Sequence, residues 1–68
     1  MLFNKYDIVN IKQGTITSKD NPEVLNHDFE ICEPYEFARG QWVVYDIITG
    51  NTFVIPEEYL VLKGNKYA

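Results

Sequence analysis

The segment from residue 41 to residue 62 most strongly constrains the fold of this 68-residue chain. Residues 41–49 predict a strand, because most positions are β-branched or aromatic and alternate between two faces. The four residues Thr49-Gly50-Asn51-Thr52 predict a tight hairpin, since Gly and Asn tolerate a positive φ. Residues 53–55 form the returning strand, which Pro56 ends because it lacks an N–H donor.

The strand predicted at residues 41–49 is apolar on both faces. Trp42 and Val44 share one face, and Val43, Tyr45 and Ile47 share the other. Such a strand lies in the centre of a closed sheet with its outer side covered, or it presents an apolar stripe to another molecule.

The remaining segments predict further short strands. Residues 56–59 suit a short 3-10 turn, and residues 60–62 suit a last brief strand. Earlier strands are predicted at residues 7–12, 15–17 and 28–33, with Phe29 and Ile31 on the inner face of the last. Residues 18–27 predict a long loop anchored by Val24 and Leu25, and residues 34–40 suit either one helical turn or a wide hairpin loop.

These elements predict an all-β fold and a single domain over residues 1–68. Five or six short strands without a long helix indicate a small closed barrel, because closure removes exposed sheet edges. A chain of this length buries only about 60% of its unfolded surface, which disfavours a deep catalytic cleft. Residues 64–68 are expected to form a flexible polar tail.

The stretch from Trp42 to Leu62 resembles the C-terminal half of Src-homology-3 (SH3) domains. The residues that carry the resemblance are Trp42, Val44, Thr49, Gly50, Ile55, Pro56, Tyr59 and Leu60, with residues 29–32 similar to the preceding strand. The opening at residues 7–14 looks more like bacterial relatives of this barrel. The resemblance implies an SH3-like barrel of a divergent phage or bacterial kind.

The resemblance also implies a place for a ligand groove. In the family this groove receives polyproline-II peptides between aromatic walls, and acidic residues in a neighbouring loop hold a basic residue of the ligand. Pro56 and Tyr59 match groove positions, and Asp20, Glu23 and Asp28 fall near the acidic loop. Gln41 stands where the family has its first groove tryptophan, which argues against proline-rich ligands.

The charge of the chain is unevenly distributed. Ten acidic and six basic residues give a formal net charge of −4. No Lys or Arg lies between residues 20 and 36, where the acidic residues are Asp20, Glu23, Asp28, Glu30, Glu33 and Glu36. This segment is either a solvated loop and strand edge or a face for a basic partner.

Aromatic residues exceed what so small a core can enclose. Trp42 or Tyr45 either caps the barrel, or aromatic residues form interface anchors with an acidic rim. The predicted partner-binding residues are Asp20, Glu23, Asp28, Glu30, Glu33, Tyr35, Glu36, Phe37, Trp42, Pro56 and Tyr59. The same interface suits a homodimer.

The inventory of reactive side chains argues against an enzyme. His27 and Cys32 are the only histidine and cysteine, so one chain cannot build a zinc site of three or four N/S ligands, and no cofactor is expected. A His27–Cys32 nucleophile pair lacks a third orienting group, which favours a buried structural thiol at Cys32. Glu57 and Glu58 suit first-turn charges of the short helical turn.

The localisation prediction is the cytoplasm. A single cysteine allows no internal disulfide, which indicates a reducing compartment. The longest apolar stretches last four residues, and residues 1–7 show no secretion signal.

The sequence therefore predicts a non-enzymatic protein-interaction module that binds a basic protein partner. It could act as a phage-type inhibitor that imitates nucleic acid, since the short, Asn-, Lys-, Ile- and Tyr-rich chain has a phage-like composition. The alternatives are a nucleic-acid-binding barrel, with Lys5, Lys12, Lys63 and Lys66 near the termini, and a structural subunit of a larger assembly. The negative net charge disfavours nucleic acid.

Overall fold

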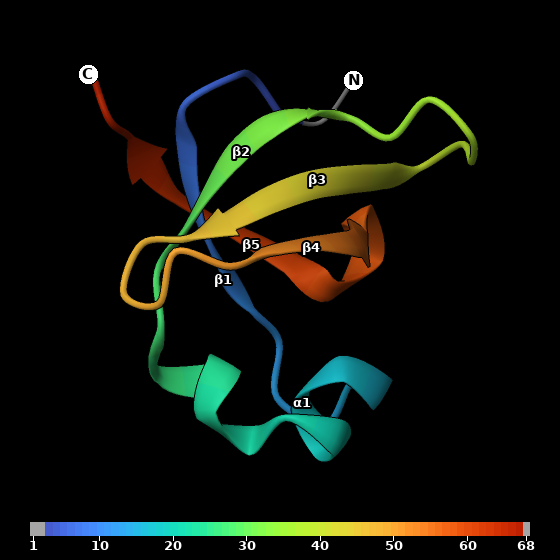
Figure 1. Ribbon diagram of the computed structural model, residues 1–68, viewed down its shortest axis with the longest axis vertical. Coiled ribbons are helices and arrows are strands. Elements are labelled where there is room, and N and C mark those ends of the chain that lie inside the picture. Colours follow the sequence, from blue (N-terminus) through green and yellow to red (C-terminus); the bar gives the residue numbers. More distant parts are fainter. Residues whose placement is uncertain (1–2, 68) are drawn as a thin grey trace.

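The computed structural model describes residues 3–67 and is mostly β (Figure 1). The strands are β1 (Asp7–Ile11), β2 (Phe29–Pro34), β3 (Gln41–Asp46), β4 (Thr52–Pro56) and β5 (Leu60–Asn65). One short α-helix, α1 (Ile16–Asp20), and two 3-10 helices, η1 (Pro22–Asn26) and η2 (Glu57–Tyr59), complete the fold. None of the helices within these residues has the length and apolar character needed to span a bilayer. Met1, Leu2 and Ala68, which the single-domain prediction includes, lie outside the described residues.

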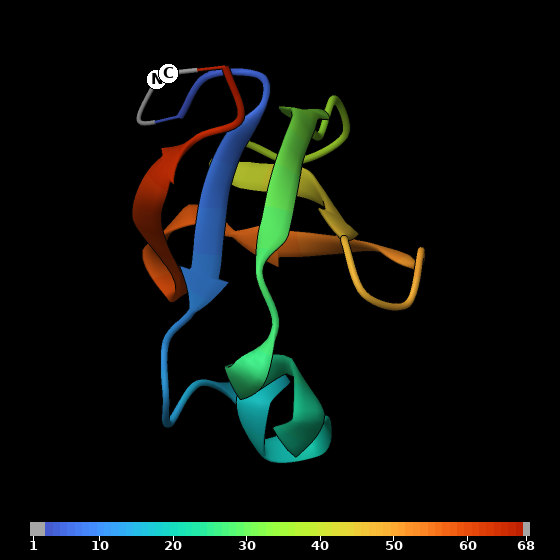
Figure 2. The same cartoon turned by 90° about the vertical axis from the view of Figure 1, so that its left-hand side faces the viewer.

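All five strands belong to one antiparallel sheet of order β4-β3-β2-β1-β5. The sheet is strongly bent: Figure 2 shows β3 and β4 running across the direction of β1 and β5. Among residues 3–67 no pairing joins the outer strands β4 and β5. The predicted all-β class is therefore confirmed, whereas the predicted closure into a barrel is not seen in the strand pairing.

Two register shifts accompany the bend. Ile31 pairs with Val44 but Glu33 pairs with Val43, so Cys32 is an extra residue in β2. In the same way, Lys63 is an extra residue of β5 opposite β1. An extra residue bends its strand and increases its local twist, which lets one sheet fold over its own core.

The core fills the concave side of the bent sheet. Its buried side chains are Phe3, Val9, Ile11, Val24, Phe29, Ile31, Trp42, Val44, Ile55 and Leu60, and Phe53 and Tyr59 pack against them. The predicted alternation of β2 is confirmed, because Phe29 and Ile31 are fully buried. Trp42 packs edge-to-face on Phe3, with ring centroids 5.6 Å apart.

The hairpin, the short turn and the last strand predicted between Gln41 and Leu62 are confirmed, but β3 ends at Asp46 and not at Thr49, and residues 47–51 form the connection to β4. β3 and β4 pair in register from Gln41↔Pro56 to Tyr45↔Thr52, and Gly50 adopts a φ of +80° in the connection. The 3-10 helix η2 follows β4 directly. The tail predicted at residues 64–68 does not begin at Gly64, because Gly64 and Asn65 belong to β5 and the Lys66 amide donates to the Tyr6 carbonyl at 2.9 Å.

The prediction of a strand at residues 15–17 is wrong, because α1 begins at Ile16. Thr15 acts as its N-terminal cap: its Oγ1 accepts a hydrogen bond from the Ser18 amide at 3.2 Å, and its carbonyl accepts one from the Lys19 amide at 3.0 Å. A capping side chain outweighs the weak strand preference of so short a segment. The predicted loop at residues 18–27 is likewise largely helical, although Val24 is buried as its anchor.

The burial difference between two isoleucines predicts different responses to loss of a methylene. Ile31 is 0% exposed and Ile48 is 67% exposed. We expect Ile31→Val to lower the free energy of unfolding by about 0.5–1.5 kcal/mol, and Ile48→Val to change it by less than about 0.5 kcal/mol. Urea unfolding followed by tryptophan fluorescence measures both. Equal effects would contradict the placement of Ile31 in the core.

Candidate functional site

Glu33 owes its position to the register shift at Cys32. Strict alternation would place Glu33 on the buried side with Phe29 and Ile31. Because Cys32 is an extra residue, Glu33 instead lies opposite Val43 and is exposed. Directly opposed residues of an antiparallel pair share a face, so Glu33 and Val43 both lie on the convex side of the sheet.

The loop from Tyr35 to Gly40 connects β2 to β3 and is held at its base. The Tyr35 amide donates to the Gln41 carbonyl at 2.9 Å, and the Glu57 amide donates to the Gly40 carbonyl at 2.7 Å. The sequence allowed either one helical turn or a wide hairpin loop at residues 34–40, and the structure has the loop. Within it, the Tyr35 and Phe37 rings meet edge-to-face at 5.4 Å, and Phe37 is 77% exposed.

Two shallow hollows flank this loop. The first, which we term the aromatic–acidic hollow, has a volume of about 280 Å³ and is lined by Glu33, Pro34, Tyr35, Glu36, Phe37 and Val43. The second, the Trp42–Glu57 hollow, measures about 260 Å³ and is lined by Pro34, Tyr35, Ala38, Arg39, Gly40, Gln41, Trp42 and Glu57. Four of the predicted partner-binding residues, Glu33, Tyr35, Glu36 and Phe37, thus meet in one hollow.

The rest of the acidic segment lies elsewhere. Asp20 ends α1 and Glu23 lies in η1, at the opposite end of the molecule from the Tyr35–Gly40 loop (Figure 1). Both are exposed. The acidic residues between positions 20 and 36 therefore do not form one continuous face.

Two further acidic residues form ion pairs with lysines near the C-terminus. Lys63 Nζ lies 2.9 Å from Asp28 Oδ1, and Lys66 Nζ lies 3.4 Å from Glu30 Oε1. Hydrogen bonds from Lys63 and Asn10 hold the pKa of Asp28 below its usual value, and Glu30 raises the pKa of Lys66. Within residues 3–67, Glu33 and Glu36 form no such ion pair.

Pro56 and Tyr59, which the resemblance places in a ligand groove, line neither hollow, whereas Gln41, at the position of the groove tryptophan, lines the second. Trp42, predicted as a partner-binding residue, belongs to the buried core and is 3% exposed. It also lines the second hollow, where its Nε1 donates to Glu57 Oε2 at 3.4 Å. Pro56 and Tyr59 are half-buried, and the Tyr59 carbonyl accepts a hydrogen bond from the Lys12 amide at 2.8 Å.

Sequence reasoning missed Val43 and Pro34 in the first hollow and Glu57 in the second. Val43 was predicted only to share an apolar strand face with Tyr45 and Ile47, and that face was the one sequence signal for its place in the hollow. Glu57 was interpreted as a first-turn charge of η2, which the structure bears out, but its proximity to Gly40 depends on the meeting of two distant turns. No local pattern indicates that meeting.

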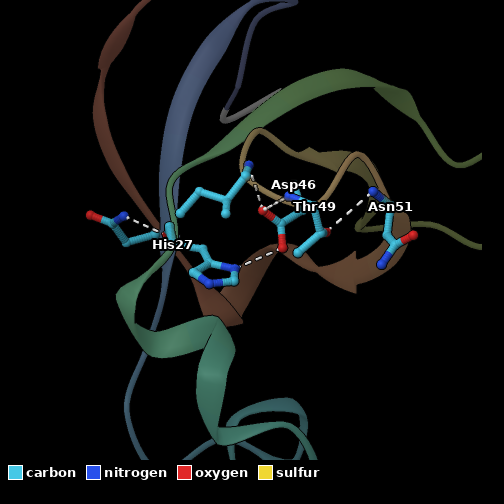
Figure 3. Close-up of polar contacts among 6 residues, drawn as sticks. His27, Asp46, Thr49 and Asn51 are labelled. Atoms are coloured by element: carbon cyan, nitrogen blue, oxygen red, sulfur yellow. Dashed lines mark hydrogen bonds and ion pairs between the residues drawn. The ribbon is translucent and has the colours of Figure 1, made fainter.

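A second polar cluster surrounds the buried Asp46 (Figure 3). His27 Nδ1 lies 2.7 Å from Asp46 Oδ2, and Asp46 Oδ1 accepts hydrogen bonds from the amides of Ile48 at 2.9 Å and Thr49 at 3.3 Å. Burial raises the pKa of Asp46, but the hydrogen bonds from His27 and the two amides outweigh it and hold this pKa below its usual value. The cluster joins the segment before β2 to the β3–β4 hairpin.

This arrangement pairs His27 with Asp46 and not with Cys32. The Cys32 Sγ lies 3.8 Å from the Glu30 carbonyl, and the residue is half-buried where a buried thiol was predicted. Burial, then the charges of Glu30 and Glu33, raise the pKa of the Cys32 thiol. Among the described residues, no group of three or more His, Cys, Asp or Glu side chains is arranged to hold a metal ion.

Comparisons with protein-family models, with curated protein sequences and with solved structures each find no match for this chain. Its membership of a family therefore stays a prediction.

The Asp46 cluster predicts a specific loss of stability in acid. The pKa of Asp46 is lower in the folded than in the unfolded chain. The contribution of its carboxylate to the free energy of unfolding is therefore complete above the ordinary pKa of 3.8, and it is lost as the pH falls through the folded pKa. We expect the free energy of unfolding to fall between about pH 5 and pH 2 less steeply in Asp46→Asn than in the unsubstituted chain. Urea titrations at several pH values test this, and parallel slopes would contradict it.

The raised pKa of Cys32 predicts slow alkylation, since the thiolate is the reactive form. At pH 8 we expect iodoacetamide to modify the folded chain severalfold more slowly than the same chain in urea, where burial is removed. Mass spectrometry of quenched time points measures both rates. Equal rates would show that the folded environment does not protect the thiol.

Proposed function

We propose that this chain is a non-enzymatic protein-interaction module that binds a basic surface of another protein through the aromatic–acidic hollow. The observation that carries the proposal is the meeting of Tyr35 and Phe37 with Glu33 and Glu36 around one hollow. Aromatic side chains concentrate binding energy, and rim carboxylates chiefly increase the rate and selectivity of encounter.

An apolar strip supports the proposal by extending the same surface. Val43 of the hollow is paired with Val54, which is 40% exposed, and Tyr45, two residues along β3, is 39% exposed. At the end of the hairpin, Ile47 and Ile48 are 47% and 67% exposed. Exposed apolar surface beside charged residues is typical of protein-binding sites. The strip agrees with the interpretation of β3 as an apolar stripe for another molecule.

We further propose that the fold is a divergent SH3-like barrel and that the protein works in a reducing compartment such as the cytoplasm. The hairpin, the 3-10 helix after Pro56 and the following strand support the kinship. A polyproline groove gains no support, because Pro56 and Tyr59 are half-buried and Gln41 replaces the groove tryptophan. A fold can be retained while its site is rebuilt elsewhere.

Nucleic acid binding is a second candidate, favoured by a cluster near the termini. Tyr6 and Tyr67 meet edge-to-face at 5.0 Å, and the ammonium groups of Lys5 and Lys66 lie 5.3 and 6.0 Å from the Tyr6 ring centre. Aromatic rings beside lysines suit bases and phosphates. The ion pair from Glu30 to Lys66 and the net charge of −4 weaken this candidate.

A random peptide library displayed on phage tests the proposed function. We expect selected peptides to combine Lys or Arg with apolar residues, and their affinity to fall at least about tenfold for the variant Glu33→Lys/Glu36→Lys, because each substitution replaces attraction by repulsion. Glu58→Lys, at an exposed position outside both hollows, is the control.

Peptides without basic residues, or peptides indifferent to the double substitution, would contradict the proposed function. The nucleic acid candidate is measured in parallel with fluorescent oligothymidylate. Binding that Lys5→Glu/Lys66→Glu abolishes, without any peptide binding, would replace the first candidate by the second.

A further inference from the structure

We infer that the aromatic–acidic hollow receives a single arginine side chain of the partner. This inference rests on the proposed function and specifies the group that the site recognises. The volume of about 280 Å³ lies at the lower end of the range of about 300–1,000 Å³ typical of small-molecule sites, and it leaves room for one side chain.

The lining of the hollow selects a cation with an apolar stem. Tyr35 and Phe37 supply two rings, Pro34 and Val43 supply apolar surface, and Glu33 and Glu36 supply two carboxylates. An anionic group would be repelled by both carboxylates. A purely apolar side chain would cover the carboxylates without giving them a partner, which costs desolvation energy.

Arginine fits this lining better than lysine. Its guanidinium is flat and weakly hydrated, so that it stacks on an aromatic face while its N–H groups donate to carboxylates. Charge-assisted hydrogen bonds from this fork are directional and strong. The lysine ammonium is a compact, strongly hydrated charge, and it loses more hydration on entering the same place.

Among the described residues, no basic side chain of the protein forms an ion pair with the carboxylates of the hollow. Asp28 and Glu30 are paired with Lys63 and Lys66, whereas within residues 3–67 neither Glu33 nor Glu36 has a basic partner. The chain's only arginine, Arg39, lines the Trp42–Glu57 hollow and not this one.

Part of the site is already in place before binding. The backbone of Glu33 is fixed by its strand position opposite Val43, and the Tyr35 amide donates to the Gln41 carbonyl at 2.9 Å. Holding these groups in position reduces the entropy lost when a ligand binds. Glu36 and Phe37 lie in the connecting loop and supply the other side of the hollow.

Titration of the ¹⁵N-labelled chain with the N-acetyl amides of arginine, lysine and citrulline tests the inference by NMR. Citrulline has almost the same shape as arginine but no charge. We expect arginine amide to shift the amide signals of residues 33–37 and 43, with the lysine probe weaker and the citrulline probe without effect. The spectra also report whether each variant remains folded.

Single neutralisations identify the carboxylates involved. We expect Glu33→Gln and Glu36→Gln each to weaken arginine amide binding by about threefold to tenfold. Glu58→Gln removes the same charge at an exposed position outside both hollows and should leave the affinity unchanged. Equal loss in all three variants would show a general charge effect and overturn the site.

The outcomes separate this inference from the proposed function. Equal binding of arginine and citrulline, or of arginine and lysine, overturns arginine recognition. If basic peptides from the library bind through Glu33 and Glu36 but arginine amide does not, the arginine inference fails and the proposed function stands. If neither peptides nor arginine amide bind, both fail.

Discussion

The extra residue at Cys32 is the constraint on which the rest of the structure depends. β2 pairs with β1 and with β3, so that it belongs to both halves of the bent sheet. One added residue lets the strand bend, and the side chains before it, Phe29 and Ile31, stay in the core while Glu33 emerges on the convex face. The same local feature thus shapes the core and creates the acidic wall of the hollow.

Buried polar groups secure the ends of this bent sheet. Asp46 receives hydrogen bonds from His27 and from the hairpin amides. Asp7 accepts from the Asn4 amide and from Asn65 Nδ2, both at 2.8 Å, which ties the start of β1 to the end of β5. Among the described residues no buried side-chain N or O atom lacks a partner. Since an unpaired buried carboxylate is costly, such complete pairing favours one conformation over looser alternatives.

The sequence predicted those features that depend on local chemistry. Alternation from Phe29 to Ile31, the hairpin that contains Gly50 and the 3-10 turn after Pro56 follow from side-chain period and backbone preference, and all three are found. The features it missed depend on groups brought together by folding. Asp28 meets Lys63 across 35 positions of sequence, and period-two reasoning has no means of locating an extra residue in a strand. The acidic residues between positions 20 and 36 look continuous in the sequence, but folding places Asp20 and Glu23 at the opposite end of the molecule from the Tyr35–Gly40 loop. Their spacing along the chain does not indicate this separation.

Local surroundings, rather than net charge, single out the hollow as a site. Of ten acidic residues, Asp7 and Asp46 are buried structural acceptors, and Asp28 and Glu30 are held in ion pairs. The exposed or half-buried remainder comprises Asp20, Glu23, Glu33, Glu36, Glu57 and Glu58. Of these six, only Glu33 and Glu36 line a hollow together with an exposed phenylalanine. Exposure of the Phe37 ring to water costs free energy, and a bound partner would remove that cost. A carboxylate binds one ligand in preference to others when the ligand must also fit an apolar surface next to it. Glu33 and Glu36 meet this condition because they line the same hollow as Phe37.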